Sequence, residues 1–212
     1  MPTKTPVKRA EELLHPRMEE IFDPIALVSL VPISKDQVLG DIGCGPGFLS
    51  IPLAKYVYDG KLYAVDLQDE MLEYVRKGAE RARLHNVETV VSKENTIPLD
   101  DDVLDGAVIA NTLHEASKPQ SLLKEVARLV KKGGWLAVVD WLPADEDGEA
   151  MTTKRRGAAE SSAHEEHVQR LGPPAKIRIN ADQVAEWATG LGLRRISGRE
   201  LNINHYIVVF RK

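Results

Sequence analysis

Residues 38–47, with the sequence VLGDIGCGPG, decide the fold of this chain. A short apolar run that contains an acidic residue at its end predicts a buried strand, and the glycines after it predict a tight loop that opens a helix. In an open sheet of parallel strands, ligands bind outside the carboxyl ends of the strands. Glycines at that place let backbone N–H groups and a helix N-terminus approach a ligand closely. The segment therefore predicts a ligand-binding loop after a first strand.

The rest of the chain alternates short β-branched runs with amphipathic stretches. Further strands are predicted over residues 61–66, 87–91, 106–110 and 135–141. Helices are predicted over residues 48–56 and between residues 121 and 130, and Gly133-Gly134 would stop the second of these. Another helix is predicted after residue 66, with four apolar side chains on one face: Met71, Leu72, Val75 and Ala79. Strands that alternate with crossover helices indicate a doubly wound, mostly parallel α/β sheet.

The end of the chain departs from this alternation. A helix over residues 182–191 is followed by two strand-like runs, 194–200 and 206–211, with only a few residues between them. So short a connection cannot contain a crossover helix, and an antiparallel hairpin is expected.

Length, charge and cysteine content limit the class of protein. The chain has 212 residues, which indicates a single domain over 1–212, and its net charge of −4 gives no reason to expect nucleic-acid binding. Cys44 is the single cysteine, so the sequence has neither a disulfide framework nor a cysteine-rich metal site. Residues 1–10 do not resemble a signal peptide, and the longest apolar run, 25–31, is too short to span a bilayer. A cytoplasmic protein is expected.

Two segments lie outside the alternation. Residues 11–22 are predicted to form an amphipathic helix within an N-terminal helical cover over 1–24. Residues 144–172 form either a solvated surface helix or a helical lid over the ligand site. Within that segment, His164 and His167 are three residues apart, whereas the helical zinc motif needs a spacing of four, so no metal site is predicted.

A second acid, Asp66, ends the second predicted strand about twenty residues after the glycine loop, as the ribose-binding acid does in nucleotide folds. The glycine order differs from the dinucleotide pattern G-x-G-x-x-G, because Phe48 takes the place of its last glycine. This difference, together with the final hairpin, disfavours an NAD-dependent oxidoreductase.

Between about residues 37 and 141, the chain resembles the class I S-adenosylmethionine (SAM)-dependent methyltransferases. Within them it is most similar to the type-11 group related to the ubiquinone/menaquinone C-methyltransferases. The segments that match are VLGDIGCGPG (38–47), YAVD (63–66), NTIPL (95–99) and LVKKGG (129–134), in the order of the family. The resemblance implies a seven-stranded Rossmann-like sheet, SAM as cofactor with S-adenosylhomocysteine (SAH) as its product, and a small-molecule methyl acceptor.

The resemblance also implies roles for individual residues. Asp41 and the loop residues Gly43, Cys44, Gly45 and Gly47 would hold the methionine end of SAM. Asp66 would bind the ribose, and Leu67 would pack on the adenine. The other residues expected to bind the cofactor are Met71, Glu94, Asn95 and Asn111.

One position departs from the family pattern. Lys93 stands where the family often has an acid that accepts from the adenine amino group, and lysine has only donors. Either Glu94 accepts that hydrogen bond from a shifted loop, or the adenine contact is mainly through the backbone.

Two residues are candidates for catalysis. His114 follows the fourth strand, where the family places groups near the transferred methyl, and could serve as a general base or as a helix cap. Asp140 ends the fifth strand on the same side of the sheet. Acids outnumber bases in residues 144–172, so a neutral or cationic acceptor of partly apolar character is expected. A non-catalytic SAM-binding module is the alternative function.

Overall fold

The structure of the chain is a computed structural model that describes residues 5–15, 18, 23–143 and 172–212. The segment expected to form a lid, 144–172, lies outside the described residues except for Gly172. The same holds for His164 and His167 and for most of residues 16–22 of the expected N-terminal cover. Both expectations about these segments stay predictions.

Seven strands form one sheet in the order β3-β2-β1-β4-β5-β7-β6. Their bounds are β1 (Val38–Ile42), β2 (Lys61–Asp66), β3 (Val87–Val91), β4 (Leu104–Ala110), β5 (Val130–Trp141), β6 (Arg194–Glu200) and β7 (His205–Arg211). The first five strands pair parallel, and β7 pairs antiparallel with both β5 and β6. The predicted doubly wound sheet with a C-terminal hairpin is confirmed.

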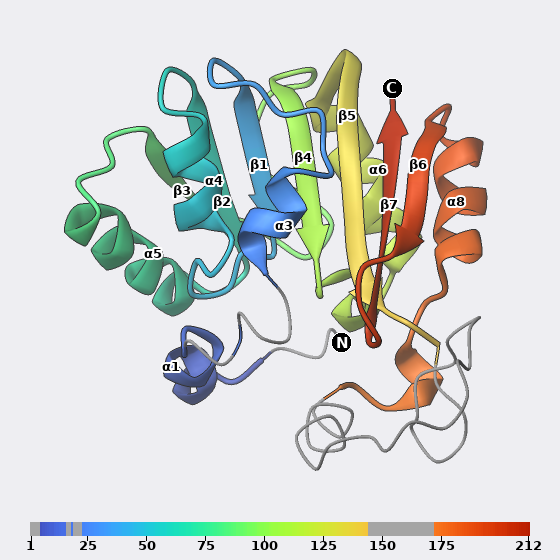
Figure 1. The fold of residues 1–212 in the computed structure, drawn as a ribbon, viewed down its shortest axis with the longest axis horizontal. Coiled ribbons are helices and arrows are strands. Elements are labelled where there is room, and N and C mark those ends of the chain that lie inside the picture. The colour runs from blue at the N-terminus through green and yellow to red at the C-terminus, as the bar shows by residue number, and fades with distance from the viewer. Residues whose placement is uncertain (1–4, 16–17, 19–22, 144–171) are drawn as a thin grey trace.

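Helices cover both faces of this sheet (Figure 1). One face packs against α3 (Pro24–Val28), α4 (Ser50–Tyr56) and α5 (Asp69–Arg81). The other face packs against α6 (Pro119–Leu129) and α8 (Ala181–Gly190). The short elements are α1 (Ala10–Leu13) and three 3-10 helices, η1 (Val7–Arg9), η2 (Leu113–Glu115) and η3 (Ala175–Ile177).

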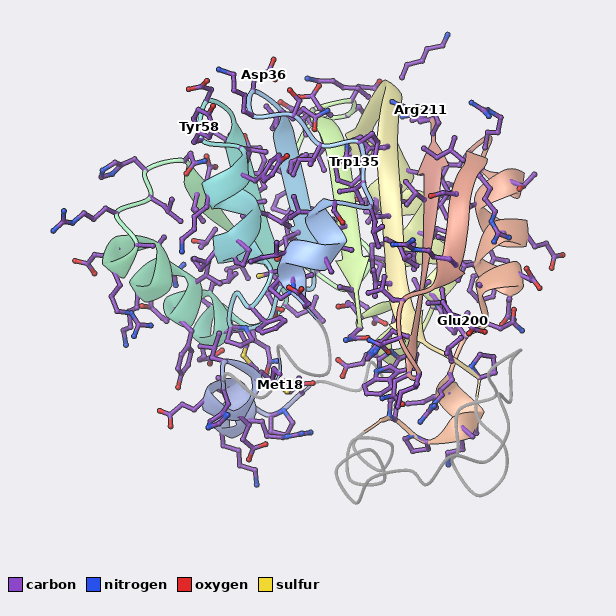
Figure 2. The ribbon with its side chains drawn as sticks, in the orientation of Figure 1. Met18, Asp36, Tyr58, Trp135, Glu200 and Arg211 are labelled. Carbon is purple, nitrogen blue, oxygen red and sulfur yellow. The ribbon has the colours of Figure 1, made fainter. Side chains whose placement is uncertain are left out.

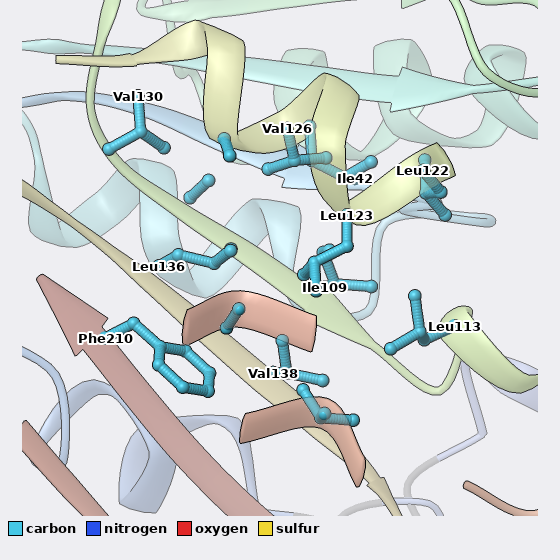
Figure 3. Close-up of a cluster of buried hydrophobic side chains, with 14 of the residues drawn as sticks. Ile42, Ile109, Leu113, Leu122, Leu123, Val126, Val130, Leu136, Val138 and Phe210 are labelled. Carbon is cyan, nitrogen blue, oxygen red and sulfur yellow. The ribbon is translucent and has the colours of Figure 1, made fainter. Parts of the chain in front are cut away.

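The alternation of side chains along β5 divides the core into two layers. Trp135, Ala137 and Val139 belong to the apolar cluster on the face of α3 and α4. Leu136 and Val138 belong to the cluster on the face of α6 and α8, which Figure 3 shows. Because β5 is buried on both faces, it is apolar at consecutive positions, as expected of a central strand in a parallel sheet.

The prediction that Gly133-Gly134 stops a helix is wrong. Helix α6 ends at Leu129, and Val130 already has an extended backbone and pairs with Leu104. The register between β4 and β5 shifts between the pair Leu104–Val130 and the pair Gly106–Trp135. Gly133, with a φ of +82°, and Gly134 therefore lie in an irregular, bulged part of β5.

The predicted helix over residues 11–22 is confirmed for residues 11–13, which lie in α1, and is interrupted after Leu13. Helix α1 ends at Leu13, and residues 14 and 15 form a turn and a bend. The sequence has proline at position 16, and a proline disfavours helical conformation in the residue before it.

The carboxyl ends of β1, β2 and β4 point to the end of the molecule where α1 lies (Figure 1). Figure 2 shows Met18 at that end and Asp36 and Tyr58 at the opposite end. The N-terminal segment thus lies beside the carboxyl ends of the parallel strands, where open α/β folds bind ligands. Among the described residues, no helix has the length and apolar character that crossing a membrane requires.

Candidate functional site

A cavity of about 850 Å³ lies at the carboxyl ends of the parallel strands. Its walls come from the loops after β1, β2, β3 and β4, from the segment after β5, and from the N-terminal residues around η1 and α1. Ten of the residues expected to form the site line it: Asp41, Gly43, Cys44, Gly45, Asp66, Leu67, Met71, Glu94, Asn111 and His114. Three expected residues, Gly47, Asn95 and Asp140, are not part of its wall.

Hydrogen bonds tie the glycine loop to the end of β2. The N–H groups of Gly43 and Cys44 donate to the carbonyl oxygen of Val65 over 2.8 and 3.0 Å. The N–H of Gly45 donates to Asp66 Oδ2, and the N–H of Gln68 donates to Asp66 Oδ1, both over 2.9 Å. The carboxylate of Asp66 is thereby fixed at the cavity wall, and it keeps acceptor capacity for a ligand because each oxygen has two lone pairs.

Asp41 is almost fully buried beneath the same loop. Ser50 Oγ donates to Asp41 Oδ2 over 2.6 Å. Burial raises the pKa of Asp41 to about 7, and the negative charge of Asp66 adds to the rise. A carboxyl in this state changes its charge near neutral pH, at the wall of the cavity.

Gly47 supports the site by packing rather than by contact with the cavity. Its φ is +94°, and a Cβ atom there would lie 3.0 Å from Cγ2 of Val75 on α5. Gly47 thus lets α5 approach the glycine loop closely, and its expected contact with the cofactor stays a prediction.

Asn111 combines two unusual features at the end of β4. Its φ is +51°, which is uncommon for a residue other than glycine, and its Oδ1 is buried without a hydrogen-bond partner. An orphan acceptor and a strained backbone together mark functional sites. Asn95 also has a buried Oδ1 without a partner, but it is not part of the cavity wall, and its expected contact with the cofactor stays a prediction.

The loop after β3 presents Ser92 and Glu94 to the cavity, not Lys93. The backbone of Lys93 is held in a turn by paired hydrogen bonds with Thr96. Glu94 Oε1 accepts hydrogen bonds from the backbone N–H and the hydroxyl of Ser117, which lower the pKa of its carboxyl. Of the two alternatives for the adenine amino group, this geometry favours Glu94.

His114 and Asp140 form a pair at the ends of β4 and β5. Nδ1 of His114 lies 2.6 Å from Asp140 Oδ1, and the backbone N–H of His114 donates to Asp140 Oδ2. Asp140 is fully buried and also accepts from the N–H of Trp141. Asp140 therefore lies behind His114, where it can orient the ring, and its expected catalytic role stays a prediction.

Sequence reasoning missed the contacts of the N-terminal segment with this cavity. Thr5 Oγ1 donates to Glu115 Oε1 over 2.9 Å, and Gln68 Nε2 donates to the carbonyl oxygen of Thr5 over 3.0 Å. Glu115 follows His114 in η2 and lines the cavity. Its position directly after His114 was the one signal in the sequence that could have identified it. In the described part of the chain, no group of histidine, cysteine and acidic side chains could hold a metal ion.

Comparisons with known proteins find similarity to methyltransferases. A family model described as a methyltransferase domain matches residues 40–138. A demethylmenaquinone methyltransferase of Listeria welshimeri is 29% identical over 114 residues, which make up 53% of this chain and 48% of that protein. An uncharacterized methyltransferase of Mycobacterium bovis is 34% identical over 125 residues, 59% of this chain and 47% of that protein. The chain spans about half the length of these curated relatives.

A solved structure extends the similarity to nearly the whole chain. The crystal structure of a SAM-dependent methyltransferase from Aquifex aeolicus matches with a TM-score of 0.79 and 28% sequence identity. The match covers 98% of this chain and 99% of that one, so the elements outside residues 40–138 also have counterparts there.

Proposed function

We propose that this chain, which belongs to the class I SAM-dependent methyltransferases of the type-11 group, transfers a methyl group from SAM to a small-molecule acceptor. The observation that carries the proposal is the carboxylate of Asp66, which is held on the cavity wall by the N–H of Gly45. This hydrogen bond joins the glycine loop and the acid of the second strand into one ligand-binding surface. The name of the Listeria relative, a demethylmenaquinone methyltransferase, supports a small-molecule acceptor.

The residues on the wall fit the chemical groups of SAM. The orphan Oδ1 of Asn111 and the carboxyl of Asp41 are acceptors for its ammonium group. Gly45 has a φ of +53° and no atom within 4 Å of the position that a Cβ would take, so the loop leaves open space there. Asp66 would accept from the ribose hydroxyls, Leu67 and Met71 would pack on the adenine, and Glu94 would accept from its amino group.

When bound, SAM supplies an electrophilic methyl group on a sulfonium centre. The protein then has to orient the acceptor and, where the acceptor nucleophile must lose a proton, to receive that proton. His114 is the residue that can receive it, because Nε2 is the basic nitrogen when Nδ1 donates to the buried Asp140. Asp140 is a positioning residue that holds the tautomer of the imidazole.

Binding of the cofactor is tested by calorimetry with SAM, SAH and NAD. Replacement of Asp66 by Ala or Asn should weaken SAH binding about tenfold to a hundredfold, because a hydrogen bond to a charged group is worth about 1.5–3 kcal/mol. Asp69→Asn is the matched control, since Asp69 is exposed and lies off the cavity wall. Unchanged SAH affinity in both Asp66 variants, or tighter binding of NAD than of SAH, would contradict the proposal.

Catalysis is tested by a screen of small metabolites with SAM that carries an isotopic label in its methyl group. A labelled small-molecule product is expected. His114→Gln should lower turnover of that acceptor by about 10²–10⁴-fold if a proton must be removed, with SAH affinity unchanged. A chain that binds SAH but labels no small molecule would be a binding module instead.

A further inference from the structure

The cavity wall is rich in carboxylates, and most of them have partners within the protein. Five acidic side chains line it in the described part of the chain: Glu12, Asp41, Asp66, Glu94 and Glu115. Glu12 accepts from an arginine, whereas the other four accept from hydroxyl or backbone N–H groups. Arg9 is the one lysine or arginine among the described lining residues, and it pairs with Glu12 over 2.9 Å.

Glu115 is a partly buried carboxylate on this wall, directly after His114 in η2. Its Oε1 accepts one hydrogen bond from the hydroxyl of Thr5, and no lysine or arginine of the described residues pairs with it. Burial raises the pKa of Glu115, and the negative charges of Asp140 and Asp66 add to the rise, whereas the hydrogen bond from Thr5 and the effect of His114 oppose it. A desolvated carboxylate that lacks a cationic partner is costly to keep in a folded protein, and a bound cation would offset that cost.

The surroundings of Glu115 indicate which part of the cavity it serves. It follows His114 in η2, on the side of the cavity formed by the ends of β4 and β5. The neighbouring wall is apolar, with Ala116, Leu122 and Trp141. The nearby guanidinium of Arg178 lies over the ring of Trp141 and donates to backbone carbonyls, and it is not part of the wall.

Glu12 pairs with Arg9, and the proposed function assigns Asp41, Asp66 and Glu94 to groups of SAM, so Glu115 is the carboxylate of the described wall that is left for an acceptor. A carboxylate on a wall that also has apolar side chains is complementary to an apolar molecule with one positive charge. We propose that Glu115 is a specificity-determining residue, which selects a small acceptor that bears an ammonium group. The inference rests on the proposed function, because it names the class of acceptor for the same cavity.

Three probes of similar shape and different charge test the inference: benzylammonium, benzyl alcohol and benzoate. Each is titrated by calorimetry into the full chain saturated with SAH, at neutral pH. Benzylammonium should bind at least about tenfold more tightly than benzoate or benzyl alcohol, since a charge-assisted hydrogen bond is about twice as strong as a neutral one and each tenfold in affinity is about 1.4 kcal/mol. Glu115→Gln should remove this preference.

Glu12→Gln is the matched control, because it removes a carboxylate from the same cavity wall that is already paired with Arg9. It should leave the preference for benzylammonium unchanged. Equal binding of the three probes, tighter binding of benzoate, or no binding of benzylammonium at millimolar concentration would overturn the inference. So would a Glu115→Gln variant that loses SAH affinity and keeps the preference, because Glu115 would then serve the cofactor. A failure of the native chain to bind SAH at all would instead contradict the proposed function.

Discussion

Asp41 shows how a single residue serves the site at a cost to the stability of the fold. Its carboxyl is buried, and its pKa is about 7 in the folded chain against an ordinary value of 3.8. Because the folded state binds this proton more tightly than the unfolded state, the free energy of unfolding falls as the pH rises from about 4 to about 7, and it levels off above. A polar group retained under such a penalty is expected where function requires it.

Asp41→Asn should therefore stabilise the protein at alkaline pH. The variant can keep an oxygen for Ser50 and has no charge to desolvate, so the gain is at most about 4 kcal/mol near pH 8 and vanishes near pH 4. Urea unfolding of the native chain and the variant at both pH values measures it, with Asp69→Asn as the exposed control. Equal stability of the native chain and the variant at alkaline pH would show that burial of the ionised Asp41 carboxyl does not destabilise the fold. SAH should bind the variant more weakly.

Among the residues of the candidate site, those near the carboxyl ends of strands could be predicted from the sequence. Asp41, Asp66 and His114 each stand at or just after the end of a strand, and parallel topology brings such ends together. The direction of a side chain is not contained in that rule. Asp140 also lies near the end of a strand, yet it stands behind His114, since a hydrogen bond joins β5 to η2 there.

The glycine loop is the element in which packing and ligand binding can be separated. Gly47→Ala would force a side chain into a φ of +94° and against Val75, so it should lower stability by about 1–2 kcal/mol or more and leave SAH affinity little changed. Gly45→Ala has open space, but the added methyl would enter the cavity and should weaken SAH binding more than it lowers the melting temperature. Thermal melts and calorimetry on both variants decide this. If both variants lost stability and SAH affinity to the same extent, packing and ligand binding would not be separate in this loop.

Helices and strands were predictable where apolar residues recur at regular spacing over a long segment. The apolar face of α5 predicted from the sequence is the face that is buried. The start of β5 was not predictable, because Val130 continues the apolar spacing of α6 while its backbone is already extended and paired with Leu104. Local spacing cannot show a pairing with a strand more than twenty residues away, and tertiary contacts overrode it there.

Over the whole molecule, segments far apart in the sequence close one cavity. Thr5 contacts Gln68 after β2 and Glu115 after β4, so it joins two loops of the cavity wall. Neither contact could be inferred from the sequence, because a threonine in an irregular segment has no periodicity that would place it. The amphipathic pattern of residues 11–22 nevertheless predicts a cover at this end of the chain.

Binding of SAH should slow amide hydrogen exchange in residues 5–15. A ligand that orders the loops after β2 and β4 also stabilises the partners of Thr5, and segments with few buried contacts exchange by local opening that such binding suppresses. Mass spectrometry of the chain with and without SAH measures the change, and α8, which lies off the cavity wall, is the internal control. If residues 41–47 become protected while residues 5–15 exchange at the same rate in both states, the N-terminal segment does not close over the bound cofactor. Protection of both would show that bound SAH stabilises the N-terminal segment together with the glycine loop, as expected of residues that form part of the cavity wall.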